Sequence, residues 1–187
     1  QREHIFAVEF IELKGDILLG IKPVANVMIK STRMFQGLAI QNLLGAYYAS
    51  IFPSPGVCHQ VRLSELDRYQ ILDARLSRNV LMVVGAQGGR YDKLIFRFAK
   101  DFSDYDSRLV PDVSSTDLNF TVLDSGVVLH LNDEGALEVF SRLRGASGIR
   151  TFQDPSVRGD DRLFHTGGQA LTARGSKLYK FTMLGQP

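Results

Sequence analysis

The sequence lacks the features that mark several large classes of protein. It holds one cysteine, Cys58, in 187 residues, which excludes an internal disulfide and a disulfide-built secreted module. The formal net charge is only +2, too small for the concentrated basic field of proteins that bind nucleic acid or anionic membranes. No apolar run approaches the ~20 residues that a membrane-spanning helix needs. We therefore expect an intracellular protein, cytoplasmic or nuclear, that does not enter a membrane.

The apolar residues that are present predict many short strands. Hydrophobic residues make up 44% of the chain, enough for a buried core, and charged residues make up 22%, the usual share in a globular protein. Val, Ile, Phe, Leu and Tyr alternate with polar residues or form short runs, which Gly, Asn, Asp, Ser or Pro interrupt. We predict a single all-β domain of antiparallel strands over residues 1–187.

One segment recurs along the chain. Lys93–Phe98, Ala136–Ser141 and Lys177–Thr182 align without gaps, and their starts are 43 and 41 residues apart. Each follows a turn that contains glycine, and two short apolar segments stand before that turn. These features define three repeats, at residues 71–98, 118–141 and 162–182. Antiparallel units of three or four strands that recur every ~40 residues are typical of β-propeller blades.

The region from Ile71 to Thr182 resembles WD40-like β-propellers in strand number, hairpin turns and period. The resemblance is one of architecture, because no repeat carries a Trp-Asp or Gly-His dipeptide and the chain has no tryptophan. It implies propeller-like blades, three well defined and up to five in all, that form a closed ring or part of one. Because the chain begins with Gln1 rather than Met, we also expect a fragment whose missing blades come from a longer chain or another subunit. A β-sandwich of the same hairpins is the alternative fold.

The first third of the chain fits the repeat less well. One blade is predicted from Gly37–Gln41, Leu43–Ala49 and Val57–Leu63, and another from Ile5–Leu13, Asp16–Ile21 and Ala25–Lys30. Within Gln36–Ser50 a short helix is the alternative, because several apolar residues there also have helical spacing.

The residues that could act in catalysis or bind a metal form no recognisable motif. The four histidines, His4, His59, His130 and His165, are scattered, and none pairs at the spacing of a helical zinc motif. Residues 101–106 carry three aspartates, but they lack the glycine and distal glutamate of a calcium loop, so we interpret them as a polar loop between blades. Cys58 is interpreted as a half-buried structural thiol. We expect no catalytic residue, no metal site and no cofactor.

The arginines near the predicted loops are the candidate binding residues. Arg142 and Arg144 leave one repeat, Arg150 enters the next, and Arg158 and Arg162 flank its loop. Loops between blades gather at the faces of a propeller, where partners dock. The chain also resembles the divergent propellers of large scaffold proteins. This resemblance implies a platform for protein partners, and some such proteins bind nucleic acid. We therefore expect a non-catalytic protein-interaction scaffold in a larger assembly.

Two alternatives stay open. A five-bladed propeller enzyme, such as a glycan hydrolase, would need two or more carboxylates within ~5–10 Å of each other in a central cavity. The candidates are Asp73, Asp112, Asp117 and Asp154. An RNA-binding platform would use the clustered arginines, with stacking contributed by Arg68-Tyr69 and Arg90-Tyr91.

Overall fold

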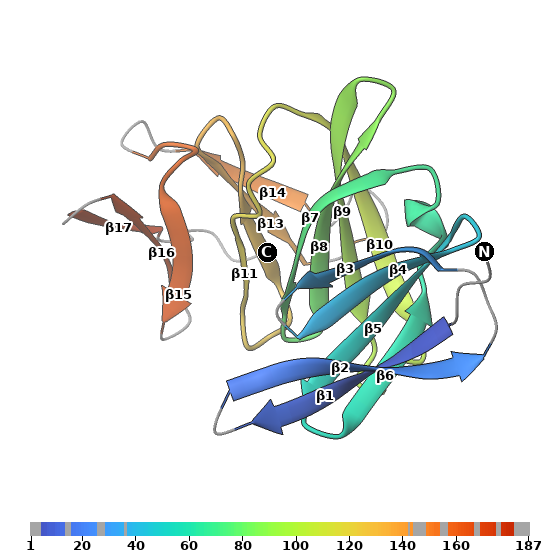
Figure 1. Cartoon of the computed structure of the whole chain (residues 1–187). Coiled ribbons are helices and arrows are strands. Elements are labelled where there is room, and N and C mark those ends of the chain that lie inside the picture. Colours follow the sequence, from blue (N-terminus) through green and yellow to red (C-terminus); the bar gives the residue numbers. More distant parts are fainter. Residues whose placement is uncertain are drawn as a thin grey trace.

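The computed structural model describes residues 5–13, 16–25, 29–35, 37–141, 143, 149–153, 157–166, 169–174 and 177–181. In these ranges the chain is all-β, apart from one turn of 3-10 helix at Ser64–Leu66. Every strand pair is antiparallel, and the strands form five sheets (Figure 1). The predicted all-β fold is therefore confirmed.

In each sheet the strand order follows the chain, so each sheet is a simple meander. The first sheet is a hairpin of β1 (Ile5–Leu13) and β2 (Asp16–Ala25). The second contains β3 (Ile29–Phe35), β4 (Leu38–Leu43), β5 (Ala46–Ser54) and β6 (Val57–Arg62). The third contains β7 (Gln70–Ser77), β8 (Val80–Gln87), β9 (Arg90–Phe98) and β10 (Tyr105–Val113). The fourth contains β11 (Phe120–Val122), β12 (Val128–Leu131), β13 (Ala136–Phe140) and β14 (Ile149–Gln153). The fifth contains β15 (Arg162–Thr166), β16 (Gln169–Arg174) and β17 (Lys177–Phe181).

The sheets stack face to face in chain order, as propeller blades do, and the described strands close no barrel (Figure 1). The hairpin of β1 and β2 lies against the second sheet, where β1 contacts β5 and β6. The recurring segment of the sequence is the third strand of its sheet each time, as β9, β13 and β17. The predicted repeats therefore correspond to sheets.

The structure corrects three sequence-based expectations. The helix considered within Gln36–Ser50 is wrong, because β4 and β5 form a hairpin there. Leu38, Ala39 and Ile40 are all buried, so both faces of β4 are covered, and a fully covered strand shows no period of two. The strand expected at Ala25–Lys30 begins at Ile29, and it pairs with β4 rather than with β2. The repeats also extend by a fourth strand, β10 or β14, that the prediction omitted.

The third sheet is buried on both faces, which explains the unbroken apolar run of β8. On one face Leu81 and Phe96 join a cluster with residues of β4 and β5. On the other face Val80, Met82 and Ile95 pack against Phe120 and others of the fourth sheet. Burial of each such side chain contributes ~1.5–3 kcal/mol, so the interfaces between sheets stabilise the fold strongly.

Three arginines of the third sheet also bind main-chain carbonyls of the fourth. The donor–acceptor pairs are Arg75 with Phe120, Arg97 with Ser141 at 3.3 Å, and Arg108 with Leu143 at 2.9 Å. The guanidinium groups of Arg75 and Arg108 also lie over the rings of Phe120 and Phe140, at 4.3 and 5.5 Å from the ring centroids. These directional contacts hold the two sheets in one register.

Candidate functional site

A groove of about 780 Å³ lies where the hairpin turns of three successive sheets meet. We call it the turn-end groove. The second sheet lines it with Gly37, Phe52 and Pro53. The third sheet lines it with Leu76, Arg78, Asn79, Lys100 and Phe102, and the β11–β12 hairpin with residues 122–126. Because adjacent hairpins of stacked meanders end at the same side of the fold, their turns necessarily come together here.

Two residues of this groove have strained backbones. Arg78 and Phe102 have φ values of 54° and 59°, which cost a residue with a Cβ about 1 kcal/mol or more. The turn at Arg78 is held because Asn79 and Phe98 exchange two hydrogen bonds, each of 2.8 Å. Phe102 is held by its N–H, which donates to the Ala99 carbonyl at 2.9 Å. Strain of this kind persists where surrounding contacts enforce it, and it is frequent at binding sites.

The floor of the groove is apolar and its rim is charged. Phe52 and Val122 are buried in the floor, and Phe102 stacks on His59 with ring centroids 4.9 Å apart. At the rim, Arg78 pairs with Asp124 at 2.5 Å, and the Asp124 side chain is 89% exposed. An apolar centre surrounded by polar groups is the usual anatomy of a protein-binding surface.

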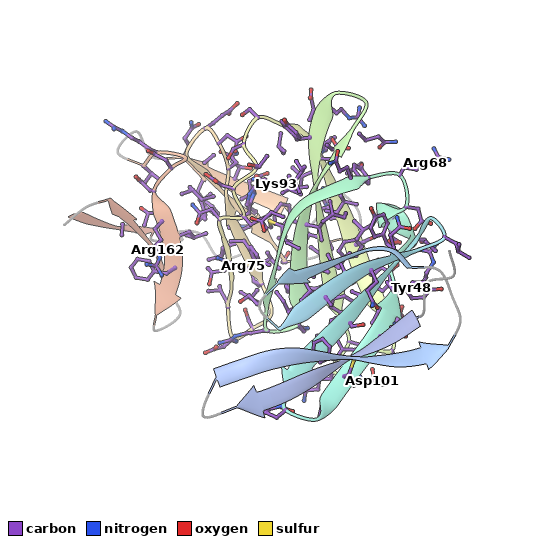
Figure 2. The ribbon with its side chains drawn as sticks, in the orientation of Figure 1. Tyr48, Arg68, Arg75, Lys93, Asp101 and Arg162 are labelled. Atoms are coloured by element: carbon purple, nitrogen blue, oxygen red, sulfur yellow. The ribbon has the colours of Figure 1, made fainter. Side chains whose placement is uncertain are left out.

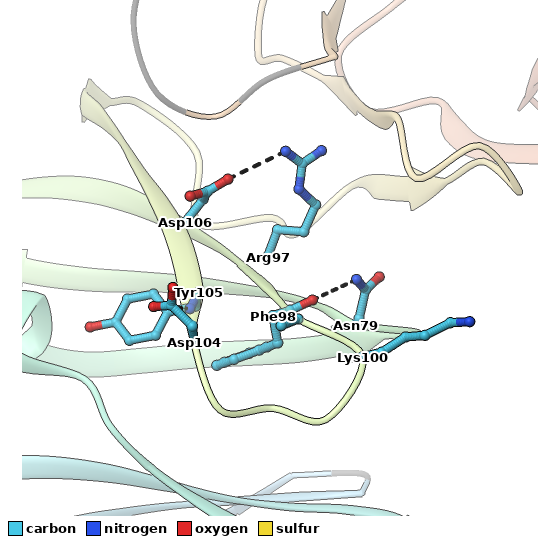
Figure 3. Close-up of a pocket in the computed structure, with 8 residues that line it drawn as sticks. Asn79, Arg97, Phe98, Lys100, Asp104, Tyr105 and Asp106 are labelled. Carbon is cyan, nitrogen blue, oxygen red and sulfur yellow. Dashed lines mark hydrogen bonds and ion pairs between the residues drawn. The ribbon is translucent and has the colours of Figure 1, made fainter.

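A second depression of about 340 Å³ adjoins the groove, since Asn79 and Lys100 line both (Figure 3). Its wall contains an ion pair between Arg97 and Asp106, with an N–O distance of 3.5 Å. Lys100 is exposed between the two hollows, and no described residue forms an ion pair with it. Its ammonium group is therefore available to an acidic partner.

A buried polar network joins the third and fourth sheets near Lys93 (Figure 2). Lys93 is 1% exposed, and its amine lies 3.3 Å from His130 Nε2, while His130 Nδ1 lies 3.1 Å from Glu138 Oε1. Asp133 is 4.0 Å from the same amine. Burial lowers the pKa of Lys93, although the nearby carboxylates oppose this shift.

The geometry of this network assigns it a packing role. With a charged Lys93 amine as the donor to His130 Nε2, the neutral imidazole would hold its proton on Nδ1, toward Glu138. The pKa of Asp133 is lowered: burial raises it, but hydrogen bonds from Ser114 and Ser115 and the charge of Lys93 outweigh burial. Lys93 is 1% exposed, so its amine is part of the buried interface between the two sheets. His130 is 2% exposed and therefore lies on a packed face of β12.

The structure separates the arginines that the sequence suggested as a binding surface. Arg142 and Arg144 lie outside the described residues. Arg150 is exposed on β14, the last strand of the fourth sheet, and so does not enter the next repeat as expected. Arg162 is exposed on β15, which contacts β11 at the opposite edge of that sheet. Three strand spacings, about 14 Å, separate these edges. Arg158 is exposed in the connection between them.

The carboxylates of the enzyme alternative are also dispersed. Asp73 lies on β7 and Asp112 on β10, the two outer strands of one sheet, so the intervening strands keep them apart. Asp117 precedes β11, and Asp154 lies outside the described residues. The aspartates of residues 101–106 belong to the β9–β10 turn and the start of β10, within one sheet rather than between blades. Cys58, expected to be half-buried, is exposed.

Sequence reasoning missed Lys93, Arg75 and the residues of the turn-end groove. The available signal for Arg78-Asn79 was a polar pair between two apolar strands, which marks a tight turn. Lys93 and Arg75 give no such signal, because only the neighbouring sheet shows what they contact.

The described residues contain no group of three or more His, Cys, Asp or Glu that could hold a metal ion. No helix in the described ranges is long and apolar enough to cross a lipid bilayer. Neither a protein-family model nor a curated protein sequence matches the chain.

Proposed function

We propose that this chain is a non-catalytic, intracellular protein-interaction module related to WD40-like propellers, and that it binds a segment of a partner protein in the turn-end groove. The observation that carries the proposal is the composition of the groove. Turns of three successive sheets supply an apolar floor and a charged rim at one place.

The size and chemistry of the groove suit a short extended peptide. Pockets that bind ligands typically enclose ~300–1,000 Å³, and this groove encloses about 780 Å³. Apolar side chains of the partner gain affinity by burial on Phe102 and Leu76, at ~25 cal/mol per Å² of apolar surface. Lys100 contributes attraction for an acidic residue of the partner and so orients the peptide.

Site-specific photocrosslinking in cells tests the groove. A benzoylphenylalanine replaces Ser125 at the groove, or Thr116 as the control, an exposed residue near the β12–β13 turn at the other end of the sheet. We expect a discrete crosslinked protein from position 125 alone. Crosslinking that is equal at the two positions contradicts the proposal.

The partner identified in this way is then purified and its affinity measured by calorimetry. We expect Lys100→Glu to weaken binding at least tenfold. Arg68→Glu makes the same change of charge at an exposed residue outside the groove, so its affinity should match that of the wild type. If the two variants weaken binding equally, the partner responds to overall charge and the groove is not its site.

A further inference from the structure

The first strands of the third, fourth and fifth sheets come together along one edge of the stack. β11 contacts β15 directly, and Arg75 of β7 lies over the ring of Phe120 of β11. Figure 2 labels Arg75 beside β11 and Arg162 at β15. This edge therefore brings two arginines from different repeats to the same short strand.

Arg75 has a fixed position. It is opposite Met82 in the β7–β8 pairing, so it faces the fourth sheet, and it donates to the Phe120 carbonyl. That bond uses one of the five N–H donors of a guanidinium group. The side chain is still exposed. The guanidinium group of Arg75 therefore has further N–H donors for a ligand at this edge.

Arg162 is positioned by its neighbours in the chain. The Asn119 side chain accepts the Leu163 N–H at 3.0 Å and donates to the Asp161 carbonyl at 2.5 Å. These two bonds tie the backbone on both sides of Arg162 to the start of β11. Asn119 and Arg162 also line a depression of about 230 Å³ at this place.

The two arginines repel each other. Burial, and after it the positive charge of Arg162, lower the pKa of Arg75. No described carboxylate lies within ion-pair distance of either guanidinium group. Asp73, the exposed acid on β7, accepts the N–H of Ala74, and Asp161 accepts that of Arg158. The positive charge is thus not balanced by a direct partner.

We propose that Arg75 and Arg162 form a binding site for a tetrahedral oxyanion of the phosphate class. An arginine fork donates two parallel hydrogen bonds to such a group, and two forks hold it from two directions. The anion removes the repulsion between the guanidinium groups and links the edges of three sheets. This site is separate from the apolar floor and the rim of the turn-end groove.

Calorimetry and thermal unfolding of the full chain with inorganic pyrophosphate test the proposal, at an ionic strength kept constant with chloride. We expect saturable binding and a rise in the midpoint of unfolding. Arg162→Gln should weaken pyrophosphate binding at least tenfold, and it removes no hydrogen bond or ring contact seen for this side chain. Arg75→Gln should weaken binding similarly, but it also loses its contacts with Phe120.

Arg108→Gln is the matched control, because Arg108 likewise binds a carbonyl and lies over an aromatic ring of the fourth sheet. We expect this variant to bind pyrophosphate as the wild type does. An equal loss in Arg108→Gln and Arg75→Gln, or unchanged binding in Arg162→Gln, overturns the proposal. Succinate, a dicarboxylate, distinguishes the anion classes: binding as tight as that of pyrophosphate contradicts a tetrahedral site. An oligonucleotide that binds through the two arginines while pyrophosphate does not also contradicts it.

Discussion

The third sheet meets its two neighbours in different ways. Toward the second sheet it presents Leu81, Val83 and Phe96 in a large apolar cluster that includes residues of β4 and β5. Toward the fourth sheet its apolar row is shorter, and Arg75, Arg97, Arg108 and Lys93 bind across the interface beside it. One sheet therefore has one face dominated by apolar packing and one that adds directional bonds.

This difference separates two requirements of a stacked fold. Apolar burial is non-directional and scales with area, so it provides free energy but leaves the relative angle of two sheets loosely defined. Hydrogen bonds from long cationic side chains to main-chain carbonyls require particular distances and angles, so they define the register. Apolar burial therefore dominates the contact of the third sheet with the second, whereas directional bonds add to its contact with the fourth.

The largest expected loss of stability comes from a substitution on the apolar face of the third sheet, toward the second sheet. Phe96→Ala removes a ring that is fully buried, which should cost about 3–5 kcal/mol of unfolding free energy through lost burial and an unfilled cavity. Urea denaturation measures the change. Leu44→Ala, at a side chain that is 66% exposed, is the control and should change stability by less than ~0.5 kcal/mol. A loss below ~1.5 kcal/mol for Phe96→Ala would mean that this face does not dominate stability.

The next largest effect is expected at Gly135, where the fourth sheet packs closely on the chain that leads to the fifth. A Cβ at Gly135 would lie 2.5 Å from the Val157 carbonyl oxygen, and φ there is 82°. Steric overlap and backbone strain together should make Gly135→Ala cost about 2–4 kcal/mol. Gly88→Ala shares a positive φ of 59° but meets no atom within 4 Å, so it should cost only about 1 kcal/mol. Thermal unfolding of the two variants side by side measures the difference, and equal losses would contradict the close packing.

On the face with cationic contacts, Lys93 should make the free energy of unfolding depend on pH. Burial lowers its pKa from 10.5 in the folded protein, so the unfolded chain binds this proton more tightly. Stability contributed by this group therefore increases as the pH rises toward 10.5. Lys93→Met should lack that increase, as followed by urea denaturation from pH 8 to 10. Parallel pH profiles for the variant and the wild type would show that Lys93 does not titrate differently on folding.

Tyr69, which packs beside the apolar face, should make the free energy of unfolding fall at higher pH, the opposite of the effect expected for Lys93. Burial and a hydrogen bond to Asp92 raise the pKa of Tyr69 from 10.0 to about 12. Its contribution to stability is complete below pH 10 and is lost between pH 10 and 12. Tyr69→Phe should be less stable at neutral pH, because Asp92 loses a donor, yet it should decline less over that range. A steeper decline in Tyr69→Phe would contradict this assignment.

The smallest expected effect lies at the rim of the turn-end groove. The Arg78–Asp124 ion pair is exposed on both sides, with side-chain exposures of 48% and 89%. Asp124→Asn should therefore change the free energy of unfolding by no more than ~0.5 kcal/mol. Chemical denaturation at low and high salt measures it. A loss above 1 kcal/mol would show that the rim is part of the structural framework rather than free to serve binding.

The repeats could be predicted because β9 and β13 are central in their sheets and therefore strongly apolar, and the segment of β17 aligns with both. The fourth strands could not. β10 lies at a sheet edge, where Asp106, Arg108 and Pro111 are tolerated, and its pairing shifts register between Val110 and Val113. The helix considered within Gln36–Ser50 failed for a related reason, since a strand covered on both faces has no alternation to distinguish it.

The candidate sites were less predictable than the fold. Reading the arginines along the chain grouped Arg150 with Arg162, but stacking places these residues at opposite edges of the fourth sheet. The same stacking brings Arg75 to Arg162, although nearly ninety residues separate them in the chain.

The sequence by itself determined the strands, their turns and their recurrence, because alternation and glycine-containing turns act between residues a few positions apart. Tertiary structure decided which side chains share an interface, why a lysine and a histidine are buried together, and where the turns of three sheets form a groove. Those outcomes depend on contacts between repeats ~40 residues apart. No local pattern records such contacts, since each repeat acquires its neighbours only when the sheets stack.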